Sequence, residues 1–103
     1  MSTYESALRI AAAHPALPGH FPRQPIAPGV LLLDLVLDHA ERWRGAPVRI
    51  AELRQVKFAA SLRPDEEARL QLALTSQELR FSITREGATI AQGVFRLATE
   101  HVR

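Results

Sequence analysis

Three residues of this sequence have the types and spacing that proton-transfer chemistry requires. His20 lies in a proline-rich stretch, and an imidazole with an unperturbed pKa of about 6.5 can accept a proton at neutral pH. Asp34 lies among apolar residues, where desolvation raises the pKa of a carboxyl group and lets it keep a proton to donate. Gly29 precedes the apolar segment, and a backbone N–H at the start of a helix can stabilise developing negative charge.

Each of these residues also has a purely structural interpretation. His20 could satisfy a backbone carbonyl within its loop, and Asp34 could be stabilised by the dipole of the helix that contains it. Gly29 could let the loop turn sharply into the helix. A metal site built from His14, His20, Asp34 and Asp38 has no recognisable ligand spacing, so we predict neither a metal nor a cofactor.

The elements that must position these residues are a stiff loop and a helix. Residues 17–29 contain four of the seven prolines and two of the five glycines, which predicts a loop over residues 14–28. Pro28-Gly29 opens the helix, which is expected to end near Arg44 because Gly45-Ala46-Pro47 follows. Residues 30–33 and 35–37 are all apolar, so we expect this helix to be buried nearly all round.

Alternating apolar residues predict strands on both sides of the helix. A skipped step between Ile50 and Leu53 predicts a bulge, and Glu86-Gly87 predicts a hairpin turn. The pattern indicates an α+β domain with an antiparallel sheet and one helix. The expected strands are residues 3–13, 48–58, 68–74, 79–84 and 90–98, followed by a frayed tail over residues 99–103.

The composition is that of one globular domain spanning residues 1–103. Hydrophobic residues make up 47% and charged residues 23%, which argues against a disordered chain, and the absence of cysteine excludes disulfides and thiolate chemistry. No signal peptide is recognisable and the longest apolar stretch is too short to span a bilayer, so we expect a soluble, cytoplasmic protein without membrane association. The net charge of +2 comes from arginines spread along the chain, which does not favour nucleic-acid binding.

Two segments around His20 and Gly29 carry a family resemblance. Gly19-His20-Phe21-Pro22, then Pro25-Ile26-x-Pro28-Gly29-Val30-Leu31, then Asp34, resemble the signature of the 3-hydroxyacyl-[acyl-carrier-protein] dehydratases. The short length and the aspartate resemble the small stand-alone members. The resemblance implies a hotdog fold, in which a curved antiparallel sheet wraps around one central helix. It also implies that His20 removes the α-proton, that Asp34 protonates the departing hydroxyl and that the Gly29 N–H polarises the thioester carbonyl.

The resemblance further implies a substrate, a carrier protein and a dimer. The substrate is a 3-hydroxyacyl chain on the phosphopantetheine arm of acyl carrier protein, and the product is the trans-2-enoyl thioester. Two hotdogs are expected to join edge to edge as a homodimer or a multiple of it, with His20 of one subunit facing Asp34 of the other. The expected substrate-binding residues are Phe21, Pro28 and Val30, and the expected docking residues for the acidic carrier are Arg23, Arg54 and Lys57.

Two positions depart from the family pattern. Arg23 stands where the family often has glycine, and Asp38 stands where it often has glutamine. Asp38 lies one helical turn beyond Asp34, and neighbouring carboxylates raise one another's pKa. These departures leave two alternatives open, a hotdog acyl thioesterase and a non-catalytic acyl-binding subunit of a hetero-oligomer. The His20 and Asp34 pair argues against a thioesterase, which does not need an acid and a base on either side of C2 and C3.

Overall fold

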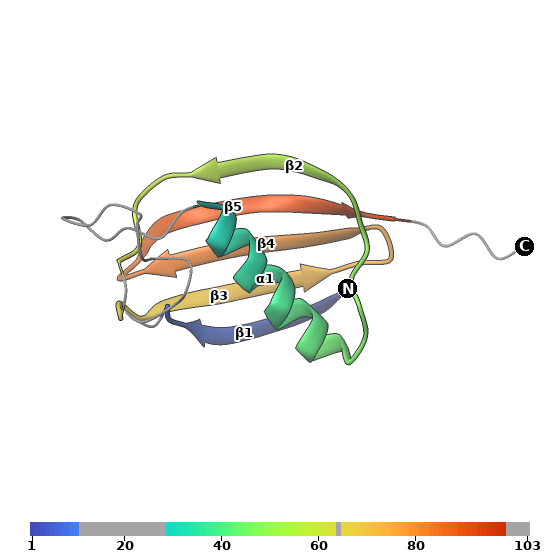
Figure 1. Ribbon diagram of the computed structural model, residues 1–103, viewed down its shortest axis with the longest axis horizontal. Helices are drawn as coiled ribbons and strands as arrows, with labels where there is room; N and C mark the ends of the chain where they lie inside the picture. The colour runs from blue at the N-terminus through green and yellow to red at the C-terminus, as the bar shows by residue number, and fades with distance from the viewer. Residues whose placement is uncertain (11–28, 64, 99–103) are drawn as a thin grey trace, which may run out of the picture.

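One helix and five strands form where the apolar periodicity of the sequence predicts them (Figure 1). The structure is a computed structural model that describes residues 1–10, 29–63 and 65–98. The predicted loop over 14–28, residues 11–13 of the first predicted strand and the tail at 99–103 lie outside the described residues. The first strand is shorter than predicted, because it ends at Leu8 and residues 9–10 are not part of it. The elements are β1 (Ser2–Leu8), α1 (Gly29–Arg44), β2 (Ile50–Phe58), β3 (Ala68–Leu74), β4 (Glu78–Arg85) and β5 (Ala88–Leu97).

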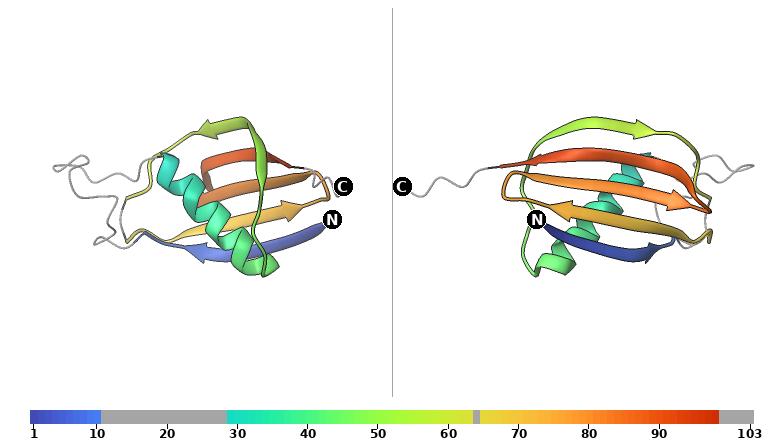
Figure 2. Two further views of the ribbon diagram at one scale, coloured as in Figure 1. Left: turned by 45° about the vertical axis from the view of Figure 1, so that its right-hand side comes forward. Right: turned by 180° about the vertical axis from the view of Figure 1, so that it is seen from behind.

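The strands form one antiparallel sheet with the order β1-β3-β4-β5-β2. Each neighbouring pair is antiparallel, and β1 and β2 are the two outer strands. Helix α1 crosses one face of the sheet diagonally, from the side of β2 and β5 to the side of β1. The other face of the sheet is not covered by any described element (Figures 1 and 2). The prediction of an α+β domain with an antiparallel sheet and one helix is therefore confirmed.

The hydrophobic core lies between α1 and the inner face of the sheet. The strict alternation of β3 and β4 sends every second side chain to this face, as a strand with one buried side requires. The core residues from the strands include Leu70, Leu72, Leu79, Phe81 and Ile83, and those from the helix are Leu31, Leu32, Val36 and Ala40. Burial of these side chains provides the main driving force that holds the helix on the sheet.

Helix α1 ends at the glycine that the sequence indicates. Gly45 has φ of +68°, and its N–H donates to the Glu41 carbonyl at 2.8 Å. A left-handed residue after the last helical residue satisfies a free carbonyl, and glycine adopts this conformation without steric cost. The Glu41 carboxylate also accepts the Val48 N–H at 2.8 Å, which ties the helix end to the chain leading into β2.

The expectation of a helix buried nearly all round is wrong for the single chain. Leu32, Val36 and Ala40 are buried along one stripe, whereas Asp34 is exposed and Val30 is 71% exposed. The physical reason is that one sheet covers only one side of a helix, so the apolar residues on the other side are left partly or fully exposed.

Strand β2 contains the predicted bulge and a second one. The register with β5 shifts between Ile50 and Glu52, where the skipped apolar step predicts it, and shifts again between Arg54 and Lys57. Gln55 in the second bulge has φ of +55°. The predicted Glu86-Gly87 hairpin turn is present between β4 and β5, and both turn residues have positive φ, as a type I′ turn requires.

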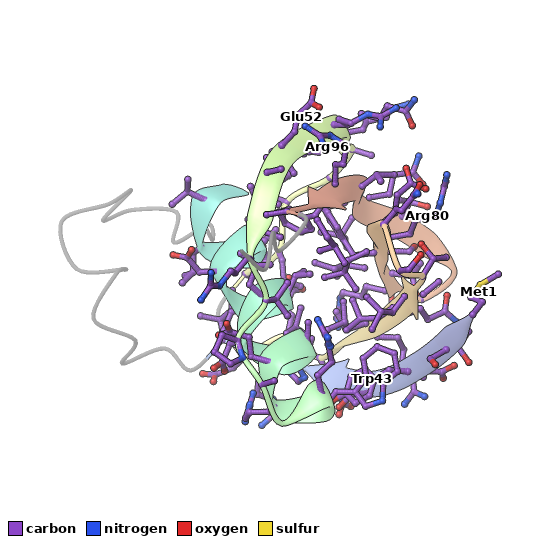
Figure 3. All side chains as sticks on the ribbon, turned by 90° about the vertical axis from the view of Figure 1, so that its right-hand side faces the viewer. Met1, Trp43, Glu52, Arg80 and Arg96 are labelled. Carbon is purple, nitrogen blue, oxygen red and sulfur yellow. The ribbon has the colours of Figure 1, made fainter. Side chains whose placement is uncertain are left out.

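The second half of α1 is attached to β1 by an aromatic cluster. The Tyr4 ring lies 5.3 Å from the Trp43 ring between centroids, and Trp43 lies beside β1 in Figure 3. The Tyr4 hydroxyl and His39 Nδ1 are 3.0 Å apart, so the hydroxyl can donate to the neutral imidazole. Burial lowers the pKa of His39, and the nearby Arg42 lowers it further, while Asp38 acts in the opposite direction.

We expect His39 to make folding stability fall in mild acid. Because its pKa is lower in the folded chain, the unfolded chain binds more protons around and below the ordinary pKa of about 6.5, and stability is lost as the pH falls through that range. Thermal unfolding between about pH 7.5 and pH 5.5 should show a falling Tm in the wild type. His39→Asn keeps an acceptor but cannot titrate, so its Tm should fall less.

Tyr4→Phe is the matched control for this experiment. It removes the hydroxyl but leaves His39 half-buried and titratable, so Tm should be lower at every pH while the acid-dependent loss persists. If Tm fell equally with pH in the wild type and in His39→Asn, His39 would not be the group that makes stability fall in mild acid.

Candidate functional site

The described part of the candidate site is the start of α1 and the end of β2. Gly29 is the first residue of α1, and the Phe58 ring at the end of β2 lies directly against it. A Cβ placed on Gly29 would lie 2.8 Å from Phe58 Cζ, which is closer than real Cβ atoms approach a neighbour. This close approach gives a structural reason for glycine at the position, beyond the sharp turn that the sequence suggests.

The start of α1 can stabilise negative charge. The first four N–H groups of a helix have no acceptor within the helix, and the aligned peptide dipoles leave a partial positive charge there. Gly29 and Val30 present these groups at the edge of the sheet formed by β2. A thioester carbonyl placed here would therefore be polarised, as the sequence interpretation of Gly29 requires.

Asp34 is placed differently from the expectation. It is exposed on α1, so its apolar sequence neighbours do not enclose it within one chain: Leu32 and Val36 are buried against the sheet, whereas Val30 is itself exposed. Asp38 one turn further on is also exposed and forms an ion pair with Arg42, at 2.9 Å between Arg42 Nη2 and Asp38 Oδ2.

Four of the predicted site residues lie outside the described residues, namely His20, Phe21, Arg23 and Pro28. The structure describes Gly29, Val30 and Asp34 on α1 and the predicted docking residues Arg54 and Lys57 on β2. It therefore leaves the pairing of His20 with Asp34 as a prediction.

The two elements of the site expose large hydrophobic side chains. Apart from Met1, the large exposed hydrophobic residues of the described chain are Val30 at 71%, Leu53 at 42% and Phe58 at 48% exposure. Leu53 and Phe58 belong to β2, whose outer edge has no partner strand among the described residues. Sequence reasoning placed Phe58 in a strand but missed its contact with Gly29, because a contact between segments far apart in the sequence leaves no local pattern. The second bulge itself coincides with a skipped apolar step between Leu53 and Val56.

The outer face of β2, β4 and β5 carries excess positive charge. The register places four basic side chains there, Arg54, Lys57, Arg80 and Arg96, against the two acids Glu52 and Glu78. Figure 3 shows Arg80 on the side of the sheet away from α1.

The two acids on this face are shared among the arginines. Glu78 lies 3.4 Å from Arg80 and 3.9 Å from Arg54, and Glu52 lies 3.1 Å from Arg96. Lys57 has no ion-pair partner within residues 1–10, 29–63 and 65–98. The face therefore has cationic groups available for an acidic surface.

Three further properties of the described residues concern cavities, metal sites and membrane-spanning helices. A shallow depression of about 500 Å³ lies on the outer face of β1, β3 and β4, on the opposite side of the sheet from α1. The described residues contain no cluster of three or more histidine or carboxylate side chains that could hold a metal ion. No helix in these same ranges is both long and apolar enough to cross a membrane.

Comparison with solved structures assigns the fold. The chain superposes on a chain of the dehydratase heterocomplex ApeI:P from Xenorhabdus doucetiae with a TM-score of 0.84 and 25% identity, covering 94% of this chain and 88% of that one. It superposes on the (R)-hydratase from A. caviae involved in PHA biosynthesis with a TM-score of 0.70 and 18% identity, over 96% and 95% of the two chains. The architecture is the hotdog fold, as the resemblance implies.

The family follows from the sequence comparison. Residues 1–94 match the family model of the ApeI-like dehydratases, and the chain belongs to that family. It is 24% identical over 83 residues to the 3-hydroxyacyl-[acyl-carrier-protein] dehydratase FabZ of Levilactobacillus brevis, which covers 74% of this chain and 56% of the relative. It is 31% identical over 68 residues to the FabZ of Syntrophobacter fumaroxidans, which covers 58% and 46%. The chain thus spans about half the length of the curated relatives it matches.

Proposed function

We propose that this protein is a hydro-lyase that converts a 3-hydroxyacyl thioester on acyl carrier protein into the trans-2-enoyl thioester, in fatty-acid or polyene-like biosynthesis. The observation that carries the proposal is membership of the ApeI-like dehydratase family over residues 1–94, a range that includes His20, Gly29 and Asp34. The position of Gly29 at the start of α1 supports it, because this is where a helix stabilises negative charge.

The proposed reaction divides the chemistry among three groups. His20 takes the α-proton from C2, and the resulting negative charge on the thioester oxygen is held by the Gly29 N–H. The C3–O bond then breaks, the C2–C3 double bond forms, and the hydroxyl leaves as water with a proton from Asp34. His20 ends with one proton more and Asp34 with one fewer, and exchange with solvent restores both.

A second hotdog chain would complete this site. Asp34 and Val30 are exposed on α1, Leu53 and Phe58 are exposed on β2, and β2 is an outer strand of the sheet; a partner that covers exposed apolar residues and an open strand edge would lie here. Covering Asp34 would also provide the desolvation that the single chain lacks. We therefore propose a homodimer, or a multiple of it, in which His20 of one subunit faces Asp34 of the other.

We expect His20→Ala and Asp34→Asn each to lower kcat by roughly 10²–10⁴-fold, because each removes one proton-transfer group. Conversion of a 3-hydroxyacyl thioester can be followed by enoyl absorbance, and circular dichroism should show that both variants are folded. Asp38→Asn is the matched control: it is also exposed on α1, pairs with Arg42 and should stay near the wild-type rate. Near-normal rates in both active-site variants would contradict the dehydratase assignment.

We expect mixed inactive variants to regain activity if the site is shared. Light scattering should give a mass of two chains or a multiple, and subunit exchange between His20→Ala and Asp34→Ala should produce heterodimers with one intact site. The intact site combines His20 of the Asp34→Ala chain with Asp34 of the His20→Ala chain. A monomeric mass, or no recovery after exchange that is verified by mass spectrometry, would rule out the shared site.

The excess positive charge on the outer face of β2 supports docking of an acidic carrier. Lys57 is the neighbour of Phe58 on β2, and the Phe58 ring lies against Gly29. Because side chains alternate along a strand, Lys57 points to the outer face of the sheet. Arg54 lies on the same outer face. Charges of this kind mainly raise the rate of encounter, and salt weakens their effect.

We expect Arg54→Glu and Lys57→Glu to lower kcat/KM for a carrier-bound substrate by about 10-fold at low salt, because electrostatic steering is lost. The same variants should process a short carrier-free thioester at the wild-type rate. Arg44→Glu, at the other end of α1, is the control and should change neither value. A carrier-bound rate that is insensitive to both salt and these substitutions would refute the docking surface.

A second candidate function is that of a subunit in a hetero-oligomer. The observation that favours it is the superposition on a chain of a dehydratase heterocomplex. A purified chain that is dimeric but inactive, and gains activity only with another hotdog chain, would support this alternative. Activity of the purified chain alone would support the homodimeric enzyme.

A further inference from the structure

The contact between Phe58 and Gly29 joins the end of an outer strand to the start of the helix. Phe58 Cζ would lie 2.8 Å, and Cε1 and Cε2 3.0 Å, from a Cβ on Gly29, so the tip of the ring fills the space beside the glycine. The two residues are far apart in the sequence. The ring therefore restrains the first turn of α1 from the side, and any side chain at position 29 would displace either the ring or the turn.

The ring itself is held by the sheet. Phe58 pairs with Ala91 of β5, and the N–H groups of Ala59 and Ala60 both donate to the Ile90 carbonyl, at 2.9 and 3.2 Å. Strand β5 lies inside the sheet between β4 and β2. The position of the first turn of α1 is thus linked through Phe58 to an interior strand.

The second bulge of β2 directs Phe58 toward the helix. From Arg54 to Lys57 the chain takes three steps on β2, whereas its partners Val94 and Gln92 are two steps apart on β5. A shift of one residue reverses the face to which each following side chain points. Without the extra residue, Phe58 would point to the outer face, away from α1.

The bulge has a conformational cost. Gln55 has φ of +55°, in the left-handed region that residues with a side chain seldom adopt because of steric strain. Bulges are common beside active sites, where they redirect a side chain. The strained conformation of Gln55 and the direction of the Phe58 ring are therefore two consequences of the same bulge.

We propose that Phe58 is a positioning residue, aimed by the bulge at Gln55, which holds the first turn of α1 so that the Gly29 N–H faces the substrate carbonyl. The carbonyl part of this inference rests on the proposed function. The positioning part concerns the backbone alone and can be measured without turnover.

The first experiment follows the backbone amides of Gly29 and Val30 by NMR in ¹⁵N-labelled protein. Phe58→Leu removes the tip of the ring, so we expect changed amide shifts and faster hydrogen exchange at these two residues. Phe95→Leu is the matched control, because Phe95 is a core residue that packs on Phe81, 5.4 Å between ring centroids. Unchanged amides in Phe58→Leu, or equal changes in Phe95→Leu, would overturn the positioning role.

The second experiment measures kcat and KM for a 3-hydroxyacyl thioester. Phe58→Leu should lower kcat by about 10-fold with little change in KM, less than the 10²–10³-fold typical of losing an oxyanion donor outright. Gly29→Ala should lower kcat further because its Cβ meets the ring. The double variant Gly29→Ala/Phe58→Leu should have a higher kcat than Gly29→Ala alone, because leucine at position 58 leaves room for the new methyl group at position 29. Independent, multiplicative losses in the double variant would overturn the inference.

The third experiment tests the bulge. Gln55→Gly can adopt the same φ without strain and should keep the wild-type kcat, whereas Gln55→Val disfavours that φ and should lower kcat as Phe58→Leu does. Glu86→Val is the control, since Glu86 has φ of +52° in the β4–β5 turn; it should lower Tm and leave kcat unchanged. Equal kcat in Gln55→Val and wild type would overturn the role of the bulge.

The experiments separate this inference from the proposed function. A wild-type chain that does not dehydrate the thioester would refute the proposed function, while the NMR comparison would still decide whether Phe58 positions the turn. An active wild type with an unaffected Phe58→Leu amide pattern would refute the inference and leave the proposed function intact.

Discussion

The structure depends on the packing of one helix across one face of an antiparallel sheet. The stripe of Leu32, Val36 and Ala40 supplies the burial, but burial alone does not set where each end of the helix lies. Specific contacts at the two outer strands do that. The first turn meets Phe58 on β2, and the last turns meet Tyr4 on β1. The helix is therefore located at both ends, and its diagonal path brings its positive end to the open edge of β2 (Figure 1).

Near that end of the helix, the single chain leaves apolar side chains and a strand edge uncovered. Val30, Leu53 and Phe58 expose apolar surface, Asp34 faces outward, and the edge of β2 has unpaired backbone groups among the described strands. A small domain buries a modest fraction of its apolar surface, so a partner at this edge would both stabilise the chain and enclose the proposed chemistry. Stability and activity would then depend on the same interface.

The two faces of the sheet serve different purposes. The inner face holds the core, and the outer face presents arginine and lysine side chains that share only two acids between them on β2, β4 and β5. Because side chains alternate along a strand, neighbouring residues can act on opposite sides of the sheet: Lys57 is available to a partner while Phe58 restrains the helix. The bulge at Gln55 decides which residue takes which side.

Local patterns in the sequence were sufficient to predict the elements and the candidate chemical groups. Local signals are strong at the ends of α1, in the alternation of β3 and β4 and at the Glu86-Gly87 turn, because glycine, proline and period-two patterns act over a few residues. The family signature likewise lies in one continuous stretch. Three features could be seen only in the folded chain: the side of α1 that is covered, the exposure of Asp34 and the contact of Phe58 with Gly29. These depend on strand register and on contacts between distant segments, which local patterns do not specify: the skipped apolar step between Leu53 and Val56 coincides with the shift at Gln55, but it does not say which residue of another element Phe58 then meets.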